Sequence, residues 1–311
     1  MKILLTGGAG FIGSHVVDKY IEEGHEVVVV DNLSTGFRSN LNPKARFYEA
    51  DICNRGAVDE IFERERPEVV NHHAAQMDVR RSVDDPVFDA TTNIIGSLNL
   101  ILSSVRHKIR KFIYISTGGA VYGEPQYLPV DENHPVNPES QYGVSKHTVE
   151  HYLYLYRHQS GLTFTVLRYP NVYGPRQNPK GEAGVIAIFI GKMLGGVTPT
   201  IYGDGEQVRD YLHVNDIVRA NSLALVKGDD DFYNIGSGIG TTVNELYRLL
   251  SKLLSFRSAA KYAPPRTGEL QKIYLTARKA KQNLGWEAEI PIDEGLHLTI
   301  DWTKKKAVTN D

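Results

Sequence analysis

Residues 2–13 read KILLTGGAGFIG, and this stretch decides the fold. An apolar run of strand type ends at Thr6, and Gly7, Gly10 and Gly13 follow at the spacing of a dinucleotide-binding turn. Glycine is needed there because the turn is tight, a pyrophosphate must approach the backbone, and the next helix must pack closely on the strand. The stretch therefore predicts a strand, a phosphate-binding turn and a helix in direct succession.

Short apolar runs and helical segments alternate up to residue 170. Runs such as 27–30 and 112–115 are apolar without alternation, as expected for strands covered on both faces. Amphipathic stretches such as 14–23 lie between them. The pattern predicts an α/β fold with a doubly wound parallel sheet. Its strands are expected at 3–6, 26–30, 45–49, 69–71, 112–116 and 164–168.

The character of the sequence changes after Tyr169. The segment 171–184 is rich in Pro, Gly and Asn, which is typical of a long functional loop. We expect residues 1–170 to form a cofactor-binding domain. Residues 171–311 are expected to form mainly a smaller, mixed α/β substrate lobe, with 208–236 returning to the main sheet.

Composition excludes several classes of protein. Hydrophobic residues make up 41%, charged residues 23%, and the net charge is −2, so no nucleic-acid or anionic-membrane partner is expected. The single cysteine, Cys53, excludes a disulfide framework and fits a reducing compartment. The first apolar run is too short for a signal peptide or membrane span. These features together lead us to expect a cytoplasmic protein. We expect no metal site, because the adjacent His72 and His73 point to opposite faces of a strand and cannot both bind one metal ion.

Asp31 indicates which dinucleotide the turn accepts. It ends the second expected strand, 18 positions after Gly13. A carboxylate there accepts hydrogen bonds from the adenosine ribose hydroxyls and repels a 2′-phosphate. The sequence therefore favours NAD over NADP, and the alternative is a glycine-rich turn that is purely structural.

Tyr142 and Lys146 form a candidate catalytic pair. Residues four apart share one face of a helix, so the phenol and the ammonium project together. A tyrosine pKa of about 10 is too high for a base at neutral pH, but a nearby ammonium and an oxidised nicotinamide would lower it. The hydroxyl of Thr117, or that of Ser116, can bond the same substrate oxygen. The alternative is an ordinary solvated helix face.

These features together resemble the extended short-chain dehydrogenase/reductase family over essentially the whole chain, and within it the bacterial-type UDP-glucose 4-epimerases. The motifs that carry the resemblance are the glycine turn with Asp31, Ser116-Thr117 before Val121-Tyr122-Gly123, Tyr142 with Lys146, residues 167–176 (LRYPNVYGPR), residues 208–211 (VRDY) and residues 234–238 (NIGSG).

The resemblance implies a Rossmann fold, tightly bound NAD, a UDP-sugar substrate and a homodimer. In the implied reaction, Tyr142 takes the proton of sugar O4 while NAD accepts the hydride from C4. The 4-keto sugar then turns over and receives the hydride on its other face. Lys146 would hold the nicotinamide ribose, and Thr117, or alternatively Ser116, would bond O4.

Matching to the family also implies the two sets of binding residues. Those for NAD are Gly7, Gly10, Phe11, Ile12, Gly13, Asp31, Asn32, Asp51, Ile52, Ala74, Ala75, Asn93, Tyr142, Lys146 and Tyr169. Those for the nucleotide sugar are Thr117, Tyr142, Asn171, Val185, Tyr202, Arg209, Tyr211, Arg266, Glu269 and Ile273. Arg209 and Arg266 would clamp the pyrophosphate, since a guanidinium meets phosphate oxygens in a bidentate way; the alternative for each is a surface ion pair.

The sequence departs from the family pattern at two places. Gly118 stands where the family's hydroxyl residue usually lies, so Thr117 needs a local shift of the backbone to replace it. Gly119 and Ala120 stand where related 4,6-dehydratases carry an acid pair, which favours epimerisation over elimination. Ile273 stands at a position where a bulky tyrosine excludes N-acetyl groups, so UDP-N-acetylhexosamines are possible further substrates.

Other functions stay open from sequence alone. A hexuronate or GDP-sugar epimerase, a 4,6-dehydratase and a decarboxylase share the scaffold, and a non-catalytic NAD-binding regulator is a more distant alternative. The apolar residues of 98–105 and 152–156 either pair across a two-fold axis or simply cover the sheet.

Overall fold

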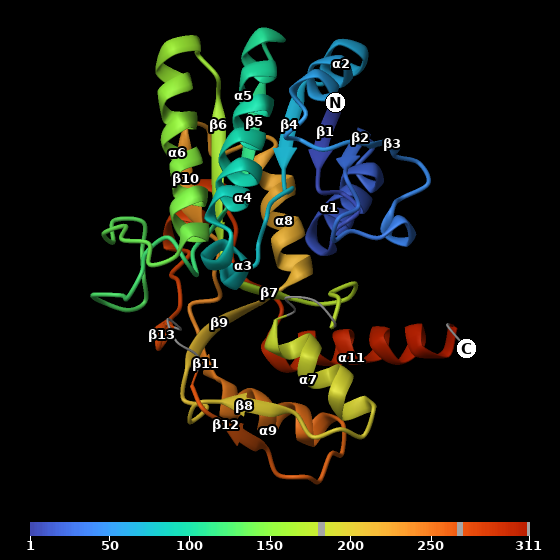
Figure 1. Ribbon diagram of the computed structural model, residues 1–311, viewed down its shortest axis with the longest axis vertical. Coiled ribbons are helices and arrows are strands. Elements are labelled where there is room, and N and C mark those ends of the chain that lie inside the picture. Colours follow the sequence, from blue (N-terminus) through green and yellow to red (C-terminus); the bar gives the residue numbers. More distant parts are fainter. Residues whose placement is uncertain (180–183, 266–269, 310–311) are drawn as a thin grey trace.

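The computed structural model describes residues 1–179, 184–265 and 270–309, and a parallel seven-stranded sheet forms its centre (Figure 1). Its strands are β1 (Lys2–Thr6), β2 (Glu26–Asp31), β3 (Arg46–Glu49), β4 (Val69–His72), β5 (Lys111–Thr117), β6 (Phe164–Tyr169) and β10 (Asp231–Asn234). They lie in the order β10-β6-β5-β4-β1-β2-β3, and each pair is parallel. The doubly wound fold and all six strands expected before residue 170 are confirmed.

Helices cover both faces of this sheet. One face packs against α1 (Phe11–Glu22), α8 (Val214–Ala224) and α10 (Arg278–Leu284). The other packs against α2 (Arg55–Glu65), α5 (Gly96–Arg106) and α6 (Gln141–Ser160). Short elements join them: η1 (Arg38–Asn40), α3 (Val79–Asp84), α4 (Pro86–Ala90) and the π-helical turn η2 (Thr91–Ile95). Burial of β2 and β5 on both faces explains their unbroken apolar runs, whereas the edge strand β3 stays partly exposed.

Some of the apolar residues of 98–105 and 152–156 cover the sheet. Leu100, Ile101 and Leu153 are fully buried in the core beneath α5 and α6. Of the two alternatives, the structure therefore supports the intramolecular role for these side chains. Other apolar side chains of this region are exposed, among them Ile95, Val144, Tyr154 and Leu155.

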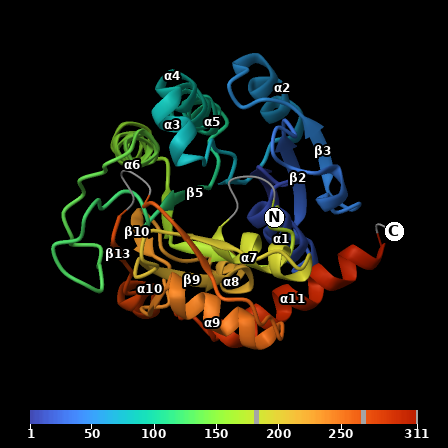
Figure 2. The same ribbon diagram turned by 60° about the horizontal axis from the view of Figure 1, so that its bottom comes forward.

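A smaller lobe lies beyond the carboxyl ends of the large sheet (Figures 1 and 2). Its strands are β7 (Asn171–Tyr173), β8 (Thr200–Tyr202), β9 (Val208–His213), β11 (Gly240–Thr242), β12 (Lys261–Ala263) and β13 (Lys272–Ile273), and its helices are α7 (Val185–Leu194), α9 (Val243–Leu253) and α11 (Ile292–Thr309). Within segment 208–236, β9 belongs to the small sheet, whereas α8 and β10 pack with the large one. Among the described residues, no helix is long and apolar enough to cross a membrane.

Candidate active site

The glycine turn between β1 and α1 leaves no room for side chains. A Cβ atom on Gly13 would lie 2.2 Å from the Gly7 carbonyl oxygen, and one on Gly7 would lie 2.7 Å from the Ala74 backbone nitrogen. Gly10 is the N-cap of α1, and no side chain caps the helix there. The N–H groups of the first turn, which starts at Phe11, are therefore available to an anion, and the helix dipole favours negative charge at this end. This geometry fits a pyrophosphate group.

Asp31 helps to shape the turn from the end of β2. Its Oδ2 atom accepts a hydrogen bond from the Ala9 backbone at 2.9 Å, and its Oδ1 atom accepts one from the Leu33 backbone at 2.8 Å. Burial raises the pKa of this carboxyl, and the two backbone donors oppose that rise. Beside it, the Asn32 amide donates to Asp51 Oδ2 at 2.9 Å. The structure thus places Asp31, Asn32 and Asp51 together next to the turn; their contacts with adenosine remain predictions.

The other residues predicted to line the cofactor lie near the carboxyl ends of neighbouring strands, where open α/β sheets bind ligands. Ile52 follows β3, Ala74 and Ala75 follow β4, and Tyr169 ends β6. Asn93 lies on η2 and is buried. Its Oδ1 atom accepts from the Gln76 backbone at 2.8 Å, and its Nδ2 atom donates to Ser145 Oγ at 3.1 Å. Asn93 therefore joins the loop after β4 to α6.

Tyr142 and Lys146 lie in the first turns of α6. The helix begins after Ser140, whose side chain accepts a hydrogen bond from the first-turn backbone. The Tyr142 phenol is hydrogen-bonded to the Thr117 side chain at the end of β5. Lys146 is buried, and its Nζ atom lies 4.4 Å from the centre of the Tyr114 ring. The structure therefore brings the Thr117 hydroxyl to the Tyr142 phenol, and it buries Lys146 one turn further along the same helix.

Burial dominates the proton affinity of this pair. It raises the pKa of Tyr142 to about 12, against the Thr117 hydrogen bond that lowers it. It lowers the pKa of Lys146 to about 7, against the charges of Glu150 and Asp89. The predicted lowering of the Tyr142 pKa is thus absent from the chain by itself, because desolvation of a phenolate outweighs the hydrogen bond that supports it.

The two candidate hydroxyls have different partners. Ser116 is buried and donates to Glu150 Oε1 at 2.5 Å. Thr117 instead lies near Asn171: a Cβ atom on Gly119 would lie 3.8 Å from Thr117 Oγ1 and 3.9 Å from Asn171 Oδ1. Of the two hydroxyls, that of Thr117 interacts with Tyr142 and lies near Asn171, whereas that of Ser116 is engaged with Glu150.

Ile273 lines the same crevice as Gly118 and Asn171. It is held there by the parallel pairing of β13 with β9, and its side chain packs against Tyr122. A Cβ atom on Gly118 would lie 2.3 Å from Leu275 Cδ1, so a larger residue there would require the Leu275 side chain to move.

The remaining residues predicted to bind the nucleotide sugar lie on the smaller lobe. Arg209, on β9, donates from Nη2 to the Leu270 carbonyl at 2.6 Å and from Nη1 to the Val208 carbonyl at 2.9 Å. Tyr211 is buried on the same strand, Tyr202 is exposed on β8, and Val185 starts α7. Arg266 and Glu269 lie outside the described residues.

A buried polar network beneath the site was missed by the sequence analysis. Arg168 on β6 donates to Glu150 from Nε at 3.0 Å and from Nη2, and to the Tyr122 hydroxyl at 2.8 Å. Tyr122 in turn donates to Asn234 Oδ1 at 2.7 Å. Two signals could have revealed it: a buried strand arginine requires an acid partner, and Glu150 lies four residues after Lys146 on the same helix face.

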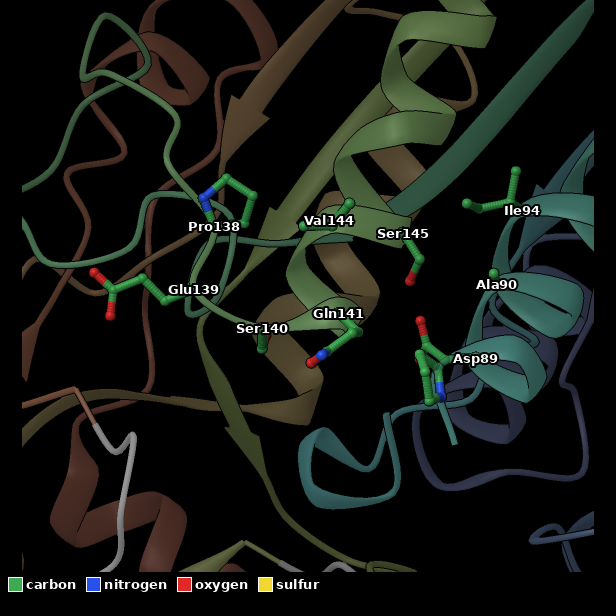
Figure 3. Close-up of a pocket in the computed structure, with 10 residues that line it drawn as sticks. Asp89, Ala90, Ile94, Pro138, Glu139, Ser140, Gln141, Val144 and Ser145 are labelled. Atoms are coloured by element: carbon green, nitrogen blue, oxygen red, sulfur yellow. The ribbon is translucent and has the colours of Figure 1, made fainter. Parts of the chain in front are cut away.

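A hollow of about 400 Å³ lies between α4 and the start of α6 (Figure 3). In Figure 3, Asp89 and Ser145 point toward one another across it. Neither Tyr142 nor Lys146 lines this hollow, so it is separate from the candidate catalytic group.

Comparison with known proteins agrees with this geometry. Residues 3–236 match the NAD dependent epimerase/dehydratase family. The UDP-glucose 4-epimerase of Mycolicibacterium smegmatis is 40% identical over 316 residues, which cover 99% of this chain and 100% of that one.

Two solved structures are also similar. A UDP-glucose 4-epimerase from Thermotoga maritima, crystallised with UDP-glucose, is 52% identical with a TM-score of 0.98 over 99% of this chain and 100% of that one. A UDP-glucose 4-epimerase from Thermus thermophilus, in complex with NAD, is 41% identical with a TM-score of 0.93 over 98% and 99%. These similarities, which agree with the glycine turn and the candidate catalytic group, show that the chain belongs to the NAD dependent epimerase/dehydratase family.

Proposed function

We propose that the protein is an isomerase that interconverts UDP-glucose and UDP-galactose at sugar C4 with tightly bound NAD. The observation that carries the proposal is the hydrogen-bonded pair Thr117–Tyr142 on a fold that also holds buried Lys146 on the same helix and a glycine turn that fits a pyrophosphate. A protein that only bound NAD would have no use for a phenol held in this way.

The chain's own residues manage the proton at sugar O4. When bound, NAD takes the hydride from C4 and returns it, and its positive charge favours the Tyr142 phenolate. Tyr142 removes the O4 proton as general base and later returns it as general acid, while the Thr117 hydroxyl orients O4. Lys146 supports the phenolate with its ammonium. Between the two proton transfers, the 4-keto sugar turns so that its opposite face meets the cofactor.

Residues 171–311 contribute most of the nucleotide-sugar site in this proposal, whereas residues 1–170 bind NAD. Asn171 contacts the sugar or diphosphate, and Arg209 contacts the pyrophosphate after exchanging its carbonyl partners. The remaining predicted contacts are Val185, Tyr202, Tyr211, Arg266 and Glu269.

Simple epimerisation is favoured over elimination. Gly119 and Ala120 offer no acid next to Thr117, so loss of water from the sugar would lack its acid and base.

The width of the sugar site is set by Ile273 in this proposal. Isoleucine is smaller than tyrosine, and Ile273 lines the crevice beside Asn171. UDP-N-acetylhexosamines are therefore further substrates; absence of any turnover of UDP-N-acetylgalactosamine would refute this extension without affecting the UDP-galactose activity.

The protein acts as a cytoplasmic homodimer in this proposal. The exposed apolar residues Val87, Ile95, Val144 and Leu155, on α4, η2 and α6, offer an apolar surface of the kind that pairs across a two-fold axis.

The test is to purify the protein, release and identify its cofactor, and follow conversion of UDP-galactose by an assay coupled to UDP-glucose oxidation. We expect bound NAD and an equilibrium mixture of the two sugars. A protein without NAD, or one whose product has lost water or carbon dioxide, would contradict the proposal.

A further inference from the structure

Glu150 lies at the centre of a buried polar cluster that also contains Ser116, Arg168 and His147 and that lies outside the predicted catalytic group. Its side chain is 8% exposed and accepts hydrogen bonds from Ser116 Oγ at 2.5 Å and from Arg168 Nε at 3.0 Å. His147 Nδ1 lies 3.1 Å from Glu150 Oε2 on the same helix. One carboxylate therefore ties α6 to β5 and β6.

The partners of Glu150 are neighbours of the proposed catalytic residues. Ser116 precedes Thr117 at the end of β5, and Arg168 lies three positions before Asn171. Because α6 carries Tyr142, Lys146 and Glu150 at successive four-residue intervals, the three side chains lie along one face of the helix. The cluster thus fixes the relative positions of the segments that converge on the crevice.

Glu150 is also one of two acids that act on Lys146. The other titratable side chains around Lys146 carry no negative charge at neutral pH. They are Tyr114 on β5, Tyr142 on α6, and His72 and His73 at the end of β4. The remaining acid, Asp89 on α4, also favours the ammonium. Burial of Lys146 favours its neutral amine, so a nearby carboxylate is needed to keep the side chain charged.

We propose that Glu150 is a positioning residue for the epimerisation, which keeps the Lys146 ammonium beside Tyr142 and holds the ends of β5 and β6 in register. The proposal rests on the proposed function. Arg168 compensates the Glu150 charge and also anchors Tyr122, so the carboxylate stays ionised although it is buried. Hydrogen bonds from His147, Arg168 and Ser116 hold the pKa of Glu150 below its ordinary value, against burial, which raises it.

The chain offers a matched control at the opposite edge of the sheet. Glu65 is 1% exposed and accepts hydrogen bonds from Arg46 Nη1 at 2.8 Å and from the Tyr48 hydroxyl. Its partners Lys2 and Arg46 begin β1 and β3, at the amino ends of the strands. Glu65 is therefore a buried, arginine-paired acid far from the crevice, although its Arg46 partner is exposed.

The experiment compares E150Q, E150D and E65Q in the NAD-loaded protein, with kcat and KM for UDP-galactose measured across pH. We expect E150Q to lower kcat about tenfold or more, with KM changed less, and to move the acidic limb of the kcat profile up by about one pH unit. The sign follows because loss of the carboxylate lowers the pKa of Lys146, and a less charged Lys146 supports the phenolate less. E150D should restore part of kcat, and E65Q should lower the melting temperature without moving the pH profile.

A second measurement does not depend on turnover. Phenolate absorbance of each protein minus that of its Y142F counterpart titrates Tyr142 directly, and E150Q should shift this titration to higher pH. If E150Q fails to fold because Arg168 is left unpaired, the double variant E150Q/R168Q removes both charges together.

The outcomes separate the two proposals. If the wild-type protein binds NAD but leaves UDP-galactose unchanged, the proposed function is contradicted. This inference would be overturned if the wild type is active and E150Q, or the double variant, has the same kcat, pH profile and Tyr142 titration as the wild type. Glu150 would then have only a structural role.

Discussion

The glycine turn and the catalytic group lie at the same edge of the large sheet but are built in different ways. The turn is formed by consecutive residues, and backbone contacts such as that of Gly13 with the Gly7 carbonyl fix its shape. The proposed catalytic group of Thr117, Tyr142 and Lys146 is assembled from β5 and α6, and side-chain contacts such as Thr117 with Tyr142 hold it. A backbone site tolerates changes in surrounding side chains, whereas a side-chain site can lose its chemistry while the fold survives.

The largest expected effect tests whether the two regions are separable. Y142F removes one oxygen atom from the catalytic group and leaves the turn intact. We expect kcat to fall by about 1,000-fold or more, since general acid–base groups contribute up to about 10⁴-fold. NAD content after purification should stay at the wild-type level. A Y142F protein that purifies without NAD would show that the phenol is part of the cofactor site as well.

The converse change breaks the turn. In G13A the new methyl group overlaps the Gly7 carbonyl oxygen at 2.2 Å, so either the turn or α1 must move. We expect NAD affinity to fall about 100-fold, as seen by cofactor retention and by calorimetric titration, and the free energy of unfolding to fall by about 1–3 kcal/mol.

G24A is the control for G13A. Gly24 has φ +82° with no neighbouring atom within 4 Å, so alanine there costs backbone strain of about 1 kcal/mol without a clash. If both variants retain NAD equally well, the close contacts of the turn are not what shapes the cofactor site.

A smaller expected effect tests which hydroxyl group, that of Thr117 or that of Ser116, orients sugar O4. T117V keeps the shape of the side chain and removes its hydrogen bond to Tyr142, so we expect kcat to fall about tenfold, with the Tyr142 pKa raised further. T117S restores the hydroxyl and should recover most of the activity. If T117V is as active as the wild type, a group other than Thr117 orients sugar O4, and Ser116 is the nearest candidate in the sequence.

The same contrast explains what the sequence could predict. The turn, its preceding strand and the role of glycine follow from residues 2–13 alone, because every contact that matters is local or made by the backbone. The choice between Ser116 and Thr117 could not be made, because it depends on Glu150, which lies 34 residues further along the chain.

Two other features depended on distant contacts. Besides the adjacent Val208 carbonyl, the carbonyl partners of Arg209 lie 61 and 62 residues away along the chain, at Leu270 and Gln271. The direction of the Tyr142 pKa shift depends on how deeply packing buries the phenol, and spacing along a helix does not reveal depth.

The smallest expected effect concerns His213. This residue lies where β9 of the small sheet leads into α8, a helix that packs against the large sheet. The ring is buried, and Nδ1 accepts a hydrogen bond from the Asn215 backbone as the N-cap of α8. Burial, aided by the charge of His15, lowers the pKa of His213 to about 4. Since the unfolded chain takes up the proton near pH 6.5, the stabilisation is complete above that pH and is lost as pH falls toward 4.

H213N removes this titration and keeps a helix-capping side chain. Between pH 7.5 and 5, the free energy of unfolding of the wild type should fall about 1–2 kcal/mol more than that of H213N, measured by urea unfolding of the NAD-free protein. H158N, which replaces an exposed histidine on α6 far from the β9–α8 junction, is the control for loss of a histidine as such. Parallel pH dependences for wild type and H213N would mean that the β9–α8 junction opens enough to protonate His213 before the chain unfolds. In that case the junction, and not the glycine turn or the catalytic group, would be the least rigid part of the molecule.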